Sequence, residues 1–296
     1  FMQGITEVGL IVEEARLTDA AEVAAIDAWV RAHPASTPFQ RPGWIMGVEH
    51  GTGQKARLLV ARLGSQIVGV LPLTYIRSML FGRALVGSGF AVDGGILTTH
   101  RKAGEMLADA AWTLAEKLGC ATLELRGGEA PAGLAWQAKA DAYLGFSRPL
   151  AADDEAELKA VPKRHRAEIR KGLANDLTFE SGRDKRLRDI HYRLYAHSVH
   201  HLGTPVFPRA LFDGVLDRLG DDADIALVSK DGTPLSAVIS LYHGGACMPY
   251  WHGAADGART MRSNEALYFL LMRQARERGC TTFDFGRSKV GTGPAA

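Results

Sequence analysis

Apolar residues follow strand-like and helix-like spacings along the chain, and these spacings predict a series of short elements in the first half. We expect strands over residues 10–14, 58–62, 67–76, 84–90 and 121–125, and helices over residues 19–31 and 100–118. The strands at 58–62 and 67–76 flank a turn and predict a hairpin. Gly119 follows the long helix at the position where glycine commonly ends one.

The second half repeats this order of elements. We expect helices over residues 163–173, 187–202 and 265–278, and strands over 178–180, 225–229, 235–242, 246–252 and 281–285. The mixture of helices with a hairpin and single strands predicts an α+β fold in each half, with helices and sheet in three layers.

Two pairs of sequence windows suggest that the halves are copies of one domain. Residues 115–128 (AEKLGCATLELRGG) align with 275–288 (ARERGCTTFDFGRS), and residues 59–75 align with 227–243 in the same order. Chance similarity between apolar strands is the alternative. The acidic stretch 149–162 lacks a strand pattern and is typical of a connection. We therefore expect domains over 1–155 and 156–296.

Composition limits the class of protein. With 46% apolar and 23% charged residues the chain is expected to be globular, and no apolar run is long enough to predict a transmembrane segment. The three cysteines, Cys120, Cys247 and Cys280, form no disulfide framework and favour a reducing, cytoplasmic location. Net charge is only +2, but residues 163–193 hold ten Lys or Arg against five acids. This segment predicts either a phosphate-binding patch or an ordinary solvated helix face.

Three motifs carry a resemblance to a known family. They are FDFGRSKVGTG at 283–293, HLGTP at 201–205 followed by Phe207 and Pro208, and Asn264 at the start of the last long helix. With the repeated order of elements, they resemble tandem GNAT proteins of the FemABX type. The resemblance is closest to FemAB-related proteins associated with PEP-CTERM/exosortase systems.

The resemblance implies two GNAT-like (acyl-CoA N-acyltransferase) domains, the second being FemAB/BioF2-like. It also implies an acyltransferase that moves an acyl or aminoacyl group from an activated donor to an amine or hydroxyl. A small-molecule or glycan-precursor acceptor, from the cell envelope or an exopolysaccharide, is the expected partner. The alternative is a catalytically degenerate GNAT-fold module that binds such a precursor or a protein-sorting partner.

GNAT domains bind the donor pyrophosphate at the N-terminus of their long helix, where backbone amides and the helix dipole favour anions. Arg101 and Gly104 match the first half of the sequence motif that usually binds this pyrophosphate. Arg262 and Asn264 lie at the corresponding place in the second copy, which lacks the glycines of the motif. We expect no permanently bound cofactor, and the donor is either acyl-CoA or aminoacyl-tRNA. Ordinary surface charge is the alternative for both arginines.

The motif at 283–293 contains further candidates. Arg287, Ser288 and Lys289 are expected to follow a strand that ends at Phe285, where two cations could hold a phosphate or carboxylate. Asp284 could accept a proton or orient an amine, or could be a structural carboxylate.

The preceding strand supplies Tyr250, Trp251 and His252. The two aromatic residues either wall an acyl or sugar pocket or belong to the core. His252 is a candidate general base, because its unperturbed pKa is close to neutrality, or else a packing residue.

Histidines and arginines in residues 163–201 complete the set. His197 and His201 share a helix face at a metal-ligand spacing, but no obvious third carboxylate accompanies them, so we expect no metal. His201 is instead predicted to contact substrate. Arg164 and Arg166 are candidates for binding a nucleotide-linked or lipid-phosphate acceptor, or a tRNA donor.

Overall fold

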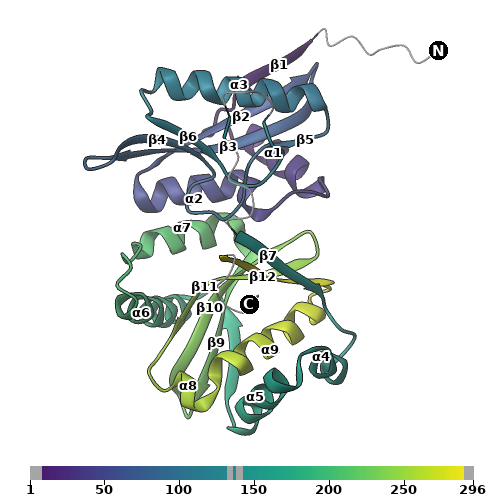
Figure 1. The fold of residues 1–296 in the computed structure, drawn as a ribbon, viewed down its shortest axis with the longest axis vertical. Coiled ribbons are helices and arrows are strands. Elements are labelled where there is room, and N and C mark those ends of the chain that lie inside the picture. The colour runs from purple at the N-terminus through teal and green to yellow at the C-terminus, as the bar shows by residue number, and fades with distance from the viewer. Residues whose placement is uncertain (1–8, 132–135, 138–142, 290–296) are drawn as a thin grey trace, which may run out of the picture. The chain divides into compact units, whose positions relative to one another are not determined.

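The computed structural model describes residues 9–131, 136–137 and 143–289 (Figure 1). The chain forms two compact units. The first comprises Phe1–Lys139 and Ala210–Arg218, and the second comprises Ala140–Arg209 and Leu219–Ala296. The domain bounds expected from the sequence, 1–155 and 156–296, stay a prediction. No helix among the described residues has the length and apolar character needed to cross a bilayer.

The first unit contains a mixed sheet in the order β1-β2-β3-β4-β6, with β5 paired to β3. The strands are β1 (Leu10–Glu14), β2 (Lys55–Leu63), β3 (Gln66–Ser78), β4 (Gly82–Gly87), β5 (Leu97–Thr98) and β6 (Thr122–Leu125). Helix α3 (Arg101–Lys117) packs its apolar side on one face of this sheet, as the 3.6-residue spacing predicts (Figure 1).

The other face of the first sheet is covered by α1 (Ala20–Ala32) and α2 (Pro42–Thr52), with the short helix η1 (Pro38–Gln40) between them. Helix α2 was not expected from the sequence, because its Gly43, Gly47 and Gly51 lower helix propensity. The reason for these glycines is close packing against α7 (Arg209–Leu219). A Cβ on Gly51 would lie 2.2 Å from Leu211 Cα, and one on Gly47 would lie 2.9 Å from the Gly214 carbonyl carbon.

The second unit repeats the topology of the first. Its sheet has the order β7-β12-β11-β10-β9-β8. In the first sheet β1, β2, β3 and β4 are antiparallel neighbours, and β6 runs parallel to β4. In the second sheet, counted from the β8 edge, β8, β9, β10 and β11 are antiparallel neighbours in the same way, and β12 runs parallel to β11. The strands are β7 (Tyr143–Pro149), β8 (Thr178–Gly182), β9 (Ala223–Lys230), β10 (Thr233–His243), β11 (Ala246–Ala254) and β12 (Thr282–Lys289). The predicted duplication is therefore confirmed at the level of strand order and direction.

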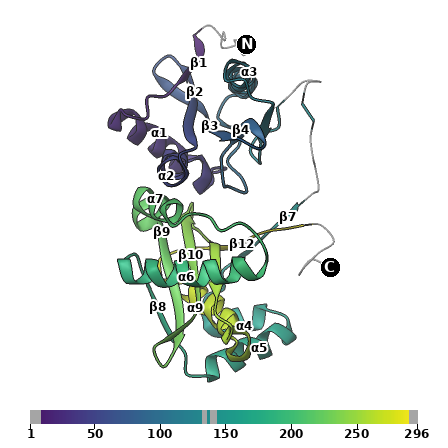
Figure 2. The same cartoon turned by 90° about the vertical axis from the view of Figure 1, so that its left-hand side faces the viewer.

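Helices cover both faces of the second sheet (Figures 1 and 2). The core between sheet and α9 (Ser263–Glu277) includes Leu267, Leu271 and Phe283, all fully buried. Helix α6 (Lys185–His201) packs on the opposite face, and α5 (Lys163–Ala174) packs against α9. Two short helices, α4 (Asp154–Ala160) and α8 (Ala258–Met261), and the 3-10 turn η2 (Gly220–Asp222) complete the unit.

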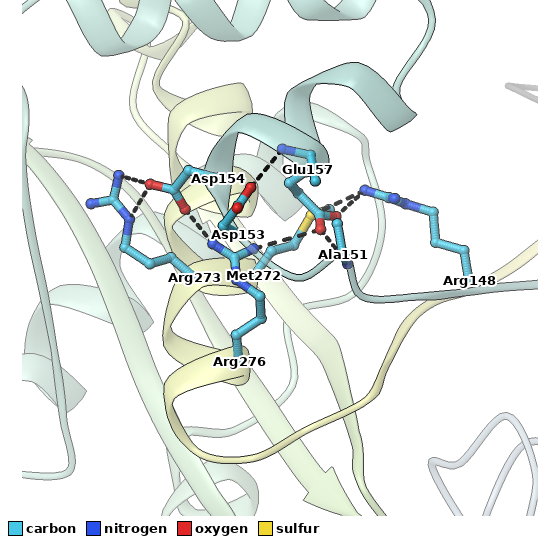
Figure 3. Close-up of polar contacts among 9 residues, drawn as sticks. Arg148, Ala151, Asp153, Asp154, Glu157, Met272, Arg273 and Arg276 are labelled. Carbon is cyan, nitrogen blue, oxygen red and sulfur yellow. Dashed lines mark hydrogen bonds and ion pairs between the residues drawn. The ribbon is translucent and has the colours of Figure 1, made fainter.

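The acidic stretch expected to be an exposed connection is instead helix α4, which is fastened to α9 (Figure 3). Glu157 is fully buried, forms an ion pair with Arg148 and accepts a hydrogen bond from the Ala151 amide at 2.7 Å. Asp154 pairs with Arg273 and Arg276 of α9, and the Arg273 hydrogen bond lowers the pKa of this carboxyl below its usual value. Local acidity was misleading because two of the three matching cations, Arg273 and Arg276, lie more than 100 residues later.

Candidate functional site

The parallel strands β11 and β12 separate soon after they begin. They are paired only at Ala246 with Thr282 and at Cys247 with Phe283, although β11 continues to Ala254. Beyond these pairs β12 stays joined to β7 as far as Lys289. An opening, meaning the stretch beyond Cys247 and Phe283 where the two strands are no longer paired, therefore lies between β11 and β12.

A β-bulge in β11 determines which side chains face this opening. Register with β10 shifts so that Ile239 pairs with Trp251 and Ser240 pairs with Pro249, which leaves Tyr250 as the extra residue. Cys247 belongs to the core on the α9 face, whereas Gly253 lies against the α6 backbone, where a Cβ would be 2.2 Å from Tyr195 N. Simple alternation would place these two residues on one face. The bulge changes the phase and sends His252 to the α9 face.

His252 belongs to a hydrogen-bonded network at the start of α9. Its Nε2 lies 2.8 Å from Asn264 Oδ1, and Ser236 Oγ donates to the same oxygen at 2.6 Å. Ser236 is fully buried and also lies 2.6 Å from the hydroxyl of buried Ser263. Because a carbonyl oxygen only accepts, His252 carries its proton on Nε2, and the Nδ1 lone pair is left to accept a proton.

The surroundings of His252 keep it neutral. Burial lowers the pKa of its imidazole below 6.5, and the bond to Asn264 opposes this shift only in part. Near neutral pH the ring is therefore uncharged, with a tautomer fixed by Asn264. A neutral imidazole with one fixed N–H is the form required of a general base.

Tyr268, four residues after Asn264 on the same side of α9, was missed by the sequence reasoning. Its ring lies 6.1 Å from the ring of His252 and 6.4 Å from that of Phe283. Phe283 in turn contacts Phe285 at 4.9 Å. Aromatic rings thus extend from β11 to β12 on the α9 face. The i, i+4 spacing from Asn264 was the signal that could have identified Tyr268.

Tyr250 and Trp251 lie at the bulge, with ring centroids 4.9 Å apart. Trp251 is only 7% exposed, and its carbonyl accepts a hydrogen bond of 2.7 Å from His191 on α6. Burial lowers the pKa of His191 from 6.5 to about 4. Trp251 is therefore a core residue. The three consecutive candidates Tyr250, Trp251 and His252 do not form one cluster.

The arginines predicted to bind ligand are mostly engaged in structural contacts. Arg262 has a left-handed backbone conformation before α9 and forms an ion pair with Glu168 of α5. Arg166 donates to the Leu158, Lys159 and Val161 carbonyls at the end of α4.

Arg164 is exposed on α5. Other cations of residues 163–193 pair similarly: Lys171 with Glu168, Lys185 with Asp189, and Arg186 with Glu180. The solvated-face interpretation of this segment is therefore better supported than a phosphate patch.

Arg287, Ser288 and Lys289 do not follow the end of a strand, which corrects the expectation. They are part of β12, opposite Gly145, Leu144 and Tyr143 of β7. The strand continues because a bulge at Asp284 to Gly286, with Gly286 at φ +83°, restores pairing with β7, a strand that was not expected. Asp284 Oδ1 accepts the Gly286 amide at 2.8 Å and so stabilises this bulge. Residues 290–293 of the motif lie outside the described part of the chain.

The first unit presents a different arrangement. Strand β6 pairs with β4 along its whole length, and the Arg126 amide continues the pairing to the Gly87 carbonyl at 3.2 Å. Arg101 is exposed in the first turn of α3, and a Cβ on Gly104 would lie 2.9 Å from the Glu129 carboxylate. A carboxylate beside this helix N-terminus competes electrostatically with a phosphate.

His201 lies near the end of α6 together with His197 and Asp256, which follows β11. Asp256 Oδ1 is 2.8 Å from His197 Nε2 and 3.8 Å from His201 Nε2. The expectation that no carboxylate accompanies the two histidines was wrong. Asp256 is brought to them by the fold from 55 residues away in sequence.

Comparisons with known proteins agree with the duplicated fold. Residues 159–292 match the family described as Acetyltransferase (GNAT) domain. No curated protein matches the chain. The crystal structure of FemX is 16% identical, with a TM-score of 0.72, 96% of this chain and 90% of that one being covered.

Two further solved structures share the fold. A tandem GNAT protein from the clavulanic acid biosynthesis pathway is 14% identical with a TM-score of 0.55, covering 97% of this chain and 92% of that one. The C-terminal domain of a putative lysylphosphatidylglycerol synthetase from Agrobacterium fabrum is 16% identical with a TM-score of 0.54, covering 91% and 79%. The chain thus consists of two domains with a GNAT-like fold, and residues 159–292 of the second match the GNAT acetyltransferase domain family.

Proposed function

We propose that the second unit transfers an acyl or aminoacyl group from an activated donor to an amine or hydroxyl acceptor. The observation that carries this proposal is the opening between β11 and β12, which begins after only two residue pairs and has the β11 bulge beside it. An extended donor placed there can use backbone groups that no neighbouring strand occupies. A backbone N–H beside a bulge is suited to polarise the carbonyl of the donor.

His252 is the proposed base. In the transfer step, the acceptor nitrogen or oxygen forms a bond to the donor carbonyl carbon, and the bond from that carbon to the donor's sulfur or ester oxygen breaks. The proton lost by the acceptor moves to His252 Nδ1 and then to the leaving sulfur or oxygen. Asn264 holds the ring through Nε2, so that Nδ1 keeps one orientation.

The donor is proposed to be acyl-CoA or aminoacyl-tRNA, with its phosphates near the first turn of α9. Backbone amides and the helix dipole at a helix N-terminus favour anions. The acceptor is proposed to be a nucleotide-linked or lipid-linked precursor of the cell envelope or of an exopolysaccharide. This acceptor class and the association with PEP-CTERM systems both rest on the sequence resemblance.

A non-catalytic role is proposed for the first unit. Its strands β4 and β6 remain paired, and Glu129 lies beside the N-terminus of α3. Both features leave less room for a phosphorylated donor than the second unit offers. In the alternative function, a degenerate binding module, both units would have this non-catalytic role.

The proposal is tested by following labelled acyl or aminoacyl groups from each donor onto envelope precursors. Replacing His252→Gln should lower kcat by about 100-fold or more, the range for loss of a general base, while the donor Kd changes little. His50→Gln, an exposed histidine in the first unit, is the matched control and should transfer at the normal rate. Saturable donor binding without transfer by the unmodified protein would overturn the proposal in favour of a binding module.

A further inference from the structure

We propose that His197, His201 and Asp256 form a binding site for a divalent transition-metal ion, with Zn²⁺ as the best-suited ion. One ligand atom from each residue lies within 4.8 Å of those of the other two. The histidines are one helical turn apart on α6, and their rings are 4.5 Å apart in an edge-on arrangement. Small side-chain rotations at the protein surface suffice to bring three such atoms to metal–ligand distances near 2 Å.

The scaffold holds the two sources of ligands together. Ser198 Oγ donates to the Ala254 carbonyl at 3.1 Å and accepts from the Ala254 amide at 2.8 Å, which fastens α6 to the end of β11. The next residue, Ala255, donates its amide to the Leu235 carbonyl at 2.8 Å. Asp256 therefore follows a segment that is fixed both to α6 and to β10, and only its side chain has to adjust.

The donor set favours a transition metal over calcium or magnesium. Two imidazoles and one carboxylate suit Zn²⁺ and related ions, whereas hard cations prefer oxygen ligands alone. Three protein ligands leave one coordination position for water or another ligand.

A pocket of about 250 Å³ adjoins the cluster, so a fourth ligand of the metal ion would bind beside this pocket. His197 and Asp256 line it, together with Arg193 and the apolar residues Ile190, Leu194 and Pro234. A metal held at the rim of this pocket, with Arg193 nearby, would attract an anionic group. The cluster and its pocket lie on the α6 side of β11, whereas His252 lies on the α9 side, so the site is separate from the proposed transfer site.

The test is metal binding by the full chain after removal of metals with a chelator. Zn²⁺ is titrated in competition with a chromophoric chelator, and Co²⁺ is titrated while its visible d–d absorption is recorded. We expect one ion for each chain and the strong absorption typical of four-coordinate Co²⁺. His197→Ala and Asp256→Ala should each weaken Zn²⁺ binding by about tenfold or more and lose the Co²⁺ bands.

His200→Ala is the matched control, because His200 is exposed on the same helix but is not part of the cluster. It should bind Zn²⁺ as the unmodified protein does. Circular dichroism of the metal-free variants checks that each is folded. The proposal is overturned if Asp256→Ala binds Zn²⁺ normally, if His200→Ala weakens binding as much as His197→Ala, or if the unmodified chain binds no ion. In those cases Asp256 and His197 form only a hydrogen-bonded contact.

Discussion

Two histidines form hydrogen bonds at β11, and the kind of partner differs between them. His191 is 1% exposed and donates to a backbone carbonyl, which ties α6 to the strand, whereas His252 is held by the side chain of Asn264 on α9. The sequence singled out His252 and Asn264 separately, but could not join them, because their contact depends on the β11 bulge. Bulges carry little local sequence signal.

The low pKa of His191 predicts acid sensitivity. A histidine whose pKa is about 4 when folded and 6.5 when unfolded stabilises the protein fully above pH 6.5 and progressively less below it. Acidification from about pH 7.5 to about pH 5 should therefore cost about 2 kcal/mol through this residue. Burial also raises the pKa of Asp224 to about 6, and this carboxyl acts in the opposite direction.

The contribution of His191 is isolated by urea unfolding of the wild type and His191→Gln at both pH values, because Asp224 is common to both proteins. The variant should lose about 2 kcal/mol less of its unfolding free energy on acidification than the wild type does. Equal losses in the two proteins would show that His191 is not the responsible group.

At the scale of elements, periodicity located most helices and strands but failed where long-range contacts override local preference. Helix α2 contains three glycines four residues apart, an arrangement that argues against a helix in isolation. Its formation depends on α7, whose backbone approaches each glycine closely. Strand β7 and the full length of β12 escaped prediction for a similar reason, since each needs the other as partner.

Close packing of α2 against α7 makes Gly51 intolerant of a side chain. Gly51→Ala should lower the unfolding free energy by about 1–3 kcal/mol, the usual cost of overpacking, even though alanine is the better helix former. Gly104→Ala in α3 is the control, because its nearest neighbour is the flexible Glu129 side chain, and it should be neutral or slightly stabilising. Chemical denaturation measures both. A neutral Gly51→Ala would mean that the two helices are not in such close contact.

At the scale of the whole molecule, the two units have the same topology but differ at the strand pair where a donor would bind. The repeated sequence windows predicted the duplication, because buried strands and the glycine-ended helix recur in order. They could not predict the difference, since it arises from how far β11 and β12 stay paired compared with β4 and β6. Nor could they identify Asp256 as the neighbour of His197, which depends on α6 packing against β11.

Hydrogen–deuterium exchange with and without acetyl-CoA or aminoacyl-tRNA tests whether the donor binds in the opening of the second unit. If the donor binds there, exchange should slow in residues 248–254 of β11 and in the first turn of α9 with one of these donors, and should not change in β4 and β6. Protection of β4, β6 and the first turn of α3 instead, or no protection by either donor, would contradict it.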